Sequence, residues 1–436
     1  MLNKLLAGVC AVLGATMSVH AETITIATVN NGDMVLMQEL SEDFTTKNPD
    51  IELEWVTLEE NILRQRVTTD IAAKGGQYDV MTIGTYEVPI WAKQGWILSL
   101  DGLDEDYDVK DILPAIRGGL SLDGSLYAAP FYGESSMVMY RQDLMQKAEL
   151  EMPKEPNWEF IAKAAEAMTD KENGVYGICL RGKAGWGENV ALLTAMSNSF
   201  GARWFDEKWN PQLDSAAWKK TMDYYLKVMN SYGPPGASSN GFNENLALFQ
   251  TGKCGMWIDA TVAAAFVTNA EESTVADKVG FALAPDNGLG KRGNWLWAWS
   301  LAIPAGTEKA DAAKKFVSWA TSKDYQELVA SKKGWRSVPP GTRTSLYENQ
   351  KYLDAAPFAQ ITLDSINSAD PNNPSVDPVP YVGVQFVAIP EFQSIGTAVG
   401  QQLSAALAGK LTAQQALQNS QRLVKRSMTK AGYYSE

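Results

Sequence analysis

Alternating strand and helix patterns near the start of the chain limit its fold more than any other sequence feature. Between residues 23 and 83, three segments with strand periodicity are separated by two with helical periodicity. In chain order these segments cover residues 23–29, 36–44, 51–55, 62–74 and 79–83. Because parallel strands need crossover helices, the pattern predicts a parallel α/β sheet. Ligands bind beyond the carboxyl ends of such strands, which points to the loops at 30–33 and 84–87.

The same rhythm continues through the second half of the chain. Strands are predicted at residues 137–140, 175–180 and 255–258, and one long extended segment at 294–304. Helices are predicted at 189–199, 218–231, 244–251, from 261, at 310–321 and 324–332, and twice between 395 and 425, with a break at Gly409. Four prolines between 367 and 380 indicate a loop. A chain of 436 residues can bury two cores, so we expect two α/β domains joined by several crossings.

The first 21 residues have the pattern of a secretory signal peptide. Lys4 gives a positive start, residues 5–17 are apolar, and residues 19–21 form a small-x-small cleavage site. The apolar run is shorter than the ~20 residues that span a bilayer. We therefore expect cleavage after Ala21 and export of the remaining chain.

Removal of this segment also removes the only histidine, His20. Without an imidazole, the chain has no Ser-His-Asp or Cys-His catalysis and no His-ligated metal. The acidic residues between 101 and 111 lack the spacing of an EF-hand calcium loop. We expect no metal and no cofactor, although two carboxylates would still suffice for glycoside hydrolysis. The net charge of -13 and the lack of a basic stretch disfavour nucleic-acid partners.

Two cysteines, Cys179 and Cys254, remain after the signal peptide. An even number in an oxidising compartment favours a disulfide. Both residues lie in short apolar runs that are typical of strands, and neighbouring strands would bring them within bridging distance. The alternative is a pair of buried free thiols.

Tryptophan is abundant, with 14 residues in the chain. Trp295, Trp297 and Trp299 alternate within the long extended segment, so a strand would place all three indoles on one face. Flat aromatic faces suit the C–H faces of carbohydrates and polyols, and each indole N–H can donate to a hydroxyl. The alternative is an aromatic stripe in the core.

Several other side chains are candidates for binding hydroxyl groups. Glu134 precedes the strand at 137–140, and its carboxylate can accept several hydrogen bonds, although a solvated carboxylate fits too. Asp259 shares one side of a strand with Trp257, or caps the helix predicted from 261. The remaining candidates lie in loops or at a helix start and fit a sugar pocket or ordinary loops equally well: Arg181, Trp186, Asn189, Trp335 and Arg336.

A series of short motifs runs through the whole chain after the signal peptide. The motifs are Tyr78-Asp79-Val80-Met81, Trp91 to Gly95, Tyr140 to Leu144, Gly252 to Asp259, Trp295 to Pro304 and Ile389 to Gln393. In their order and spacing the chain resembles the extracellular solute-binding proteins of ABC transporters, the large group that includes maltose-binding protein. Within that group it is similar to the sorbitol- and mannitol-binding proteins of bacterial polyol importers.

The resemblance implies a fold and a division of the chain. It implies two α/β lobes of the class II periplasmic binding protein type, with a ligand cleft between them and a multi-segment hinge. The signal peptide then covers 1–21. The first lobe covers 22–131 plus 302–355, and the second covers 132–301 plus 356–436.

The resemblance also implies which residues contact the ligand. Asn31 and Asp33 fall on the first loop at the cleft, and Tyr86 and Glu87 on the second. Glu134 falls where the family has a carboxylate in the cleft. Further cleft loops carry Trp186, Asn189, Trp257 and Asp259.

The implied function is reversible binding of a ligand, without catalysis. The chain would be a monomeric periplasmic protein that binds a linear polyol such as sorbitol, mannitol or arabitol, closes its lobes, and delivers the polyol to the membrane permease subunits. A monosaccharide or a disaccharide such as maltose or trehalose is an alternative ligand. A secreted carboxylate-based glycosidase is the alternative from another class.

Overall fold

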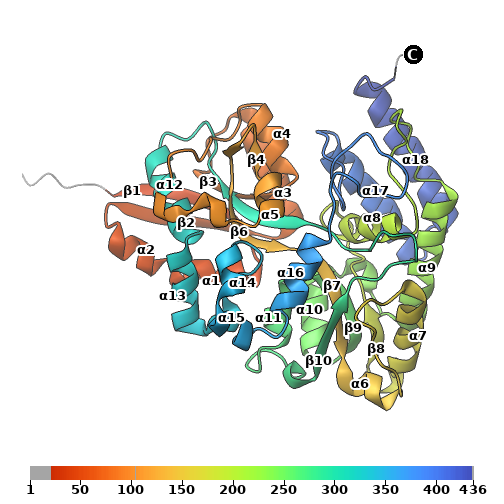
Figure 1. The fold of residues 1–436 in the computed structure, drawn as a ribbon. Coiled ribbons are helices and arrows are strands. Elements are labelled where there is room, and N and C mark those ends of the chain that lie inside the picture. The colour runs from red at the N-terminus through yellow and green to blue at the C-terminus, as the bar shows by residue number, and fades with distance from the viewer. Residues whose placement is uncertain (1–20, 104, 435–436) are drawn as a thin grey trace, which may run out of the picture.

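The computed structural model describes residues 21–103 and 105–434. The predicted signal peptide lies outside the described residues, apart from Ala21. The chain forms two lobes, each built around one sheet with helices packed on it (Figure 1). Among the described residues, no helix combines the length and the apolarity that crossing a membrane requires.

The first lobe contains a five-stranded sheet in the order β2-β1-β3-β11-β6. Its strands are β1 (Glu22–Val29), β2 (Ile51–Leu58), β3 (Val80–Gly84), β6 (Ala129–Glu134) and β11 (Trp297–Ala302). The helices on this side of Figure 1 are α1 (Gly32–Leu40), α2 (Glu42–Lys47), α3 (Glu60–Ala73), α4 (Glu87–Lys93), α5 (Pro114–Gly119), α12 (Ala310–Ala320), α13 (Lys323–Lys333), α14 (Thr344–Glu348) and α15 (Gln350–Ala355). A small hairpin pairs β4 (Ser121–Leu122) with β5 (Ser125–Leu126).

The second lobe contains a four-stranded sheet in the order β10-β7-β9-β8. Its strands are β7 (Ser136–Arg141), β8 (Tyr176–Cys179), β9 (Cys254–Ala260) and β10 (Val279–Leu283). The other helices are α6 (Gln142–Lys147), α7 (Trp158–Met168), α8 (Asn189–Ser199), α9 (Ala216–Tyr232), α10 (Phe242–Gln250), α11 (Ala263–Val267), α16 (Ala359–Asn367), α17 (Phe392–Leu407) and α18 (Ala413–Lys430). Of these, α16 lies beside the chain crossings between the lobes and contacts both β6 and β7 (Figure 1).

Local sequence explains where α3, which later carries two cavity residues, begins and ends. The Glu59 carboxylate caps its first turn by accepting from the backbone N–H groups of Asn61 and Ile62, at 3.1 and 3.3 Å. Its C-cap residue Lys74 is left-handed with φ 52°, and Gly75 follows. The predicted helix at 62–74 is therefore confirmed, two residues longer at its start.

The predicted parallel arrangement holds for part of the first sheet. Strands β1, β2 and β3 are parallel, as the alternating pattern predicts. Strand β11 runs antiparallel to both β3 and β6, so the sheet is mixed. The chain reaches β11 from the other lobe and not through a crossover helix, which is why periodicity near the start of the chain does not reveal it.

The structure differs in two ways from the single helix predicted at 36–44. It is divided into α1 and α2 at Ser41. Its fully buried residues are Met34, Met37 and Phe44, whereas Leu36 and Leu40 are only half-buried. The methionines lie one turn apart, and this displaces the core-facing stripe from the leucines.

The lobes are joined at closely spaced crossings. The first lies at Ser135, between the end of β6 and the start of β7, and another connects β10 to β11. The lobe boundaries remain a prediction, but sheet pairing places residues 132–134 and 297–301 with the first sheet, a few residues beyond the predicted limits. The segment 367–380 contains no helix or strand, as its prolines predict. The C-terminal helices separate around Gly409, which has φ 73°.

A disulfide joins Cys179 of β8 to Cys254 of β9, and both residues are completely buried. The predicted bridge is therefore confirmed and the free-thiol alternative is wrong. The bridge closes a loop with a sequence separation of 75 residues. In the chain-entropy model, such a loop restricts the unfolded chain by about 4 kcal/mol.

Replacing both cysteines by alanine is expected to lower the free energy of unfolding by up to about 4 kcal/mol. The loss should come mainly from the unfolded chain, so secondary structure at 25 °C should not change. Guanidinium unfolding of the variant and the parent protein measures the difference. A change below about 1 kcal/mol would contradict the stabilising role.

Candidate ligand-binding site

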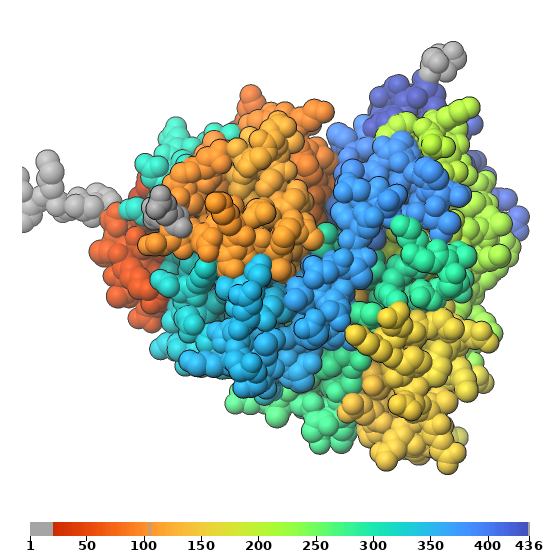
Figure 2. Space-filling model, in the orientation of Figure 1, coloured from red at the N-terminus to blue at the C-terminus, as the bar shows by residue number. Residues whose placement is uncertain are grey.

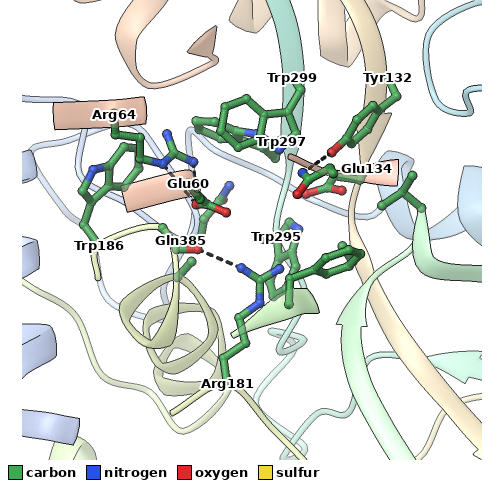
Figure 3. Close-up of a pocket in the computed structure, with 16 residues that line it drawn as sticks. Glu60, Arg64, Tyr132, Glu134, Arg181, Trp186, Trp295, Trp297, Trp299 and Gln385 are labelled. Carbon is green, nitrogen blue, oxygen red and sulfur yellow. Dashed lines mark hydrogen bonds and ion pairs between the residues drawn. The ribbon is translucent and has the colours of Figure 1, made fainter. Parts of the chain in front are cut away.

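A cavity of about 460 Å³, mouth included, lies between the lobes. The lining residues come from both lobes and from the crossings between them (Figure 3). They are Asn31, Glu60, Arg64, Tyr132, Glu134, Arg181, Trp186, Gly187, Ala191, Phe242, Ala260, Val262, Trp295, Trp297, Trp299 and Gln385.

The lobes are closed around this cavity. Figure 2 shows them meeting without an open cleft on the face in view. Lys183 of the second lobe pairs with Glu59 at the start of α3, at 2.7 Å. Asn61 donates to the backbone oxygen of Ala184, at 3.3 Å.

Tryptophans form one wall of the cavity. Trp297 and Trp299 of β11 pack edge to face, with ring centroids 5.4 Å apart and planes at 82°. Trp186 of the second lobe meets Trp297 at 5.9 Å. The indole N–H groups of Trp186 and Trp297 are buried and have no hydrogen-bond partner among the described residues. A hydroxyl-bearing ligand would supply the missing acceptors.

Arg64 of α3 lies against this aromatic wall. Its guanidinium donates to Glu60 at 2.9 and 3.1 Å and to Glu87 at 3.0 Å. Three indole rings contact its charged carbon, which provides cation–π attraction. They are Trp186, Trp297 and Trp299, at 4.1, 4.8 and 4.5 Å from the ring centroids.

Arg181, just after β8, carries the second guanidinium of the cavity. It binds both carboxylate oxygens of Asp259, with the shortest contact at 2.7 Å. It also donates to the backbone oxygen of Gly187 at 2.9 Å and approaches Glu188 at 3.4 Å. Trp257 donates its indole N–H to Asp259 at 3.1 Å. This planar two-point pairing fixes the guanidinium in the cavity wall.

Glu134 is the carboxylate that the cavity leaves without a partner. It ends β6 and has an exposed fraction of 5%. No hydrogen bond or ion pair joins it to another described residue, whereas the neighbouring Tyr132 hydroxyl accepts from Asn31 at 2.8 Å. Loss of hydration on burial raises the pKa of Glu134 well above its usual value.

Seven of the predicted site residues line the cavity: Asn31, Glu134, Arg181, Trp186, Trp295, Trp297 and Trp299. Four more lie directly behind it and hold lining residues in place. They are Glu87, which binds Arg64; Asp259, which binds Arg181; Trp257, which donates to Asp259; and Tyr86, whose ring packs on Trp186 at 4.7 Å. The ligand-binding roles remain predictions.

The predicted capping role of Asp259 is wrong. Helix α11 begins at Ala263, and its N-cap residue is Val262. The carboxylate is turned instead toward Arg181 and its own strand, where it also accepts from the Ala260 N–H at 2.7 Å.

Three other predicted residues lie outside the lining. Asn189 is buried and donates to the Gly400 oxygen at 2.9 Å, so it supports the loop that carries Trp186. Arg336 donates to the Thr268 oxygen at 2.6 Å. Trp335 is half-buried against the core. Their loop and helix-start positions suggested a pocket, but their partners are backbone groups and core side chains.

Asp33 is the last of the predicted residues outside the lining. It lies in the first turn of α1 and is 5% exposed. Burial, followed by the negative charge of Glu272, raises the pKa of Asp33 to about 7. Its predicted contact with ligand remains untested.

Sequence patterns missed several lining residues, chiefly Glu60, Arg64, Tyr132 and Gln385. Glu60 and Arg64 are four residues apart and form an i,i+4 salt bridge on α3, but the predicted helix begins at 62 and leaves Glu60 out. Nothing in the sequence indicated that this salt bridge is buried under the other lobe. Gln385 comes from a loop near the C-terminal helices, where no periodicity marks it.

Two glycines let the lobes approach. A Cβ atom on Gly187 would lie 2.2 Å from Glu60 Oε1, and one on Gly185 would lie 2.3 Å from Asn61 Oδ1. Both contacts join α3 of the first lobe to the loop before α8. A side chain at either position would therefore have to displace the end of a side chain on α3 when the lobes close.

Gly187→Val is expected to hold the lobes apart, because its side chain would displace the paired Glu60. The radius of gyration in small-angle X-ray scattering should rise on the order of 1 Å above the ~22 Å expected for a compact chain of this length. Gly306→Val is the control, since a Cβ there meets nothing within 4 Å. Equal radii for the two variants would contradict the close-approach role.

Asp33→Asn is expected to stabilise the protein more as pH rises. Asp33 keeps its proton in the folded state up to about pH 7, whereas the usual value is 3.8. Ionisation of the unfolded chain therefore lowers stability between about pH 4 and pH 7. The asparagine variant avoids this loss, so its advantage should be near zero at pH 4 and approach about 4 kcal/mol at pH 8.

Urea unfolding at both pH values measures this effect. Glu39→Gln, at an exposed position of the same helix, is the matched control. A pH-independent difference between the Asp33→Asn variant and the parent would contradict the assignment.

Comparison with known proteins places the chain in a family. The family model for bacterial extracellular solute-binding proteins matches residues 30–327. The mannitol-binding protein of Pseudomonas aeruginosa is 55% identical over 413 residues, which is 95% of this chain and 94% of the relative.

Solved structures agree with this placement. An ABC transporter solute-binding protein of Agrobacterium vitis S4, crystallised with bound D-mannitol, is 71% identical. The match has a TM-score of 0.94 and covers 95% of this chain and 100% of that one. A ribitol complex from Agrobacterium radiobacter K84 shares the fold with a TM-score of 0.82 at 24% identity, over 94% of this chain and 99% of that one. The chain belongs to the bacterial extracellular solute-binding protein family.

Proposed function

We propose that this protein is the substrate-binding component of an ABC importer and that it captures a linear hexitol, D-mannitol in particular. The bound D-mannitol of the Agrobacterium vitis protein carries this proposal, because that chain is 71% identical over nearly the whole length. The mannitol-binding relative in Pseudomonas aeruginosa supports the same ligand class.

The chemistry of the cavity supports a polyol. Indole faces of Trp295, Trp297 and Trp299 offer apolar contact for the C–H groups of an extended carbon chain. The carboxylate of Glu134 accepts from hydroxyl groups, and the unpartnered indole N–H groups donate to them. Each such hydrogen bond contributes about 1 kcal/mol net, and those to the carboxylate contribute more.

Lobe closure couples binding to delivery. The ligand contacts residues of both lobes only in the closed form, so it shifts the population from open to closed. The permease subunits of the importer then bind the closed lobes and accept the ligand. We propose that the protein acts as a monomer in this cycle.

We also propose where the protein works and that it catalyses no reaction. The signal peptide is cleaved after Ala21, and the chain works in the periplasm. Capture and release leave the ligand chemically unchanged. Incubation with oligosaccharides, followed by product analysis, should give no turnover. Glu134-dependent hydrolysis would favour the glycosidase alternative instead.

A thermal-shift series with hexitols, pentitols, monosaccharides and disaccharides tests the ligand class. A ligand that binds only the folded state at 100 times its Kd adds about 2.7 kcal/mol of stability. We expect the largest rise in melting temperature with D-mannitol. A rise with disaccharides alone would overturn the polyol proposal and keep the family.

Trp297→Ala is expected to weaken D-mannitol binding at least tenfold, because it removes both the stacking face and an N–H donor. Trp297→Phe, which keeps the ring face, should lose less. Trp335→Ala removes a half-buried indole outside the lining and is expected to stay within twofold of the parent protein. Calorimetric titration measures all three, and equal affinities for the Trp297 and Trp335 variants would contradict the site.

A further inference from the structure

Carboxyl groups outnumber cationic groups around the cavity. Within the described part of the chain, five carboxylates lie in its lining or pair with its arginines: Glu60, Glu87, Glu134, Glu188 and Asp259. Opposite them are two guanidinium groups, and Lys183 approaches Glu188 at 3.9 Å from the edge. All five carboxylate residues are at most 9% exposed, so water screens them poorly.

Both guanidinium groups are already neutralised by the protein. Arg181 is shared between Asp259 at 2.7 Å and Glu188 at 3.4 Å. Arg64 is shared between Glu60 at 2.9 Å and Glu87 at 3.0 Å. Each arginine thus faces two carboxylates. A carboxylate or phosphate on a ligand would have to displace one of them.

Glu134, in contrast to the arginines, has no charged or hydrogen-bonding partner within the described part of the chain. It lines the cavity at 5% exposure, and no cation, N–H or hydroxyl of the described residues reaches its carboxylate. Beside it lie its strand partner Trp297 and the Tyr132 ring, and the positive charge of Arg181 acts on it without a hydrogen bond or ion pair. A buried carboxyl group without a partner holds its proton, since burial raises the pKa of Glu134 well above its usual value. A cation brought to it favours the ionised form and gains both a charge pair and a charge-assisted hydrogen bond.

We propose that Glu134 makes the site selective for ligand charge, so that it accepts hexitols bearing an ammonium group alongside neutral hexitols and rejects hexitols bearing a carboxylate or phosphate. This inference rests on the proposed function. The ammonium group binds at Glu134, and the Trp297 ring face adds cation–π attraction. An anionic hexitol gains no such pairing at Glu134 and finds no free cation in the described lining, because both arginines are already paired.

Calorimetric titration at pH 7 with defined ligands tests the proposal. The probes are D-mannitol, its 1-amino-1-deoxy and 2-amino-2-deoxy analogues, and D-mannonate. At least one amine is expected to bind as tightly as mannitol or more tightly, and mannonate at least 100-fold more weakly. If both amines bind over tenfold more weakly than mannitol, or if mannonate binds within tenfold of it, the proposal is wrong.

A charge-neutral variant assigns the effect to one residue. Glu134→Gln keeps the size and hydrogen-bonding capacity of the side chain, so it should weaken the amine at least tenfold more than it weakens mannitol. Glu134→Asp keeps the charge and should retain the preference of the parent. Equal losses for both ligands in the glutamine variant would overturn the assignment.

The mannitol titration separates the two proposals. If the parent protein binds no mannitol, the hexitol function itself fails. If mannitol binds and the amine preference is absent, only the charge selectivity fails. Circular dichroism melts confirm that each variant is folded before titration.

Discussion

Two buried arginines, each held between two carboxylates, are the constraint around which the cavity is built. Removing one partner would leave an uncompensated charge under the closed lobes, which is strongly destabilising. Arg64 comes from α3 of the first lobe and rests on Trp186 of the second. Arg181 comes from the second lobe and joins the end of β8 to the end of β9. Arg64 is therefore neutralised within the first lobe and gains the Trp186 ring on closure. The pairings of Arg181 make one wall rigid whether or not the lobes are closed.

The chain crossings explain why the aromatic and acidic groups converge. Strand β6 ends in Glu134 one residue before the second sheet begins, and β11 returns beside it with Trp297 opposite Glu134. Both strands therefore carry cavity residues where the lobes meet. The surfaces that bind a ligand and the segments that flex during opening share the same few residues. A hinge of this kind lets a small change in strand direction separate the walls of the site.

Much of this organisation could be predicted from the sequence. Sequence patterns locate β1, β2, α3 and α8 within a few residues. Trp295, Trp297 and Trp299 all line the cavity, but Trp295 precedes β11 and lies against Arg181, whereas Trp297 and Trp299 lie against Arg64. The positions of Glu60 and Gln385 could not be predicted, since each reaches the cavity through contacts between distant segments. Trp335 and Arg336 show the converse limit: an aromatic or polar residue in a loop can pack on the core or bind a backbone oxygen outside the cavity.

The contact between Arg64 and Trp186 should make the intrinsic tryptophan fluorescence of the protein sensitive to lobe closure. The guanidinium of one lobe lies 4.1 Å from an indole of the other, and two further indoles surround it. Tryptophan emission depends on the polarity and charge around the ring. Opening would withdraw the cation from Trp186 and let water in, while Trp297 and Trp299 stay on the first sheet. The wavelength of intrinsic fluorescence should therefore follow lobe movement in real time, without an attached dye.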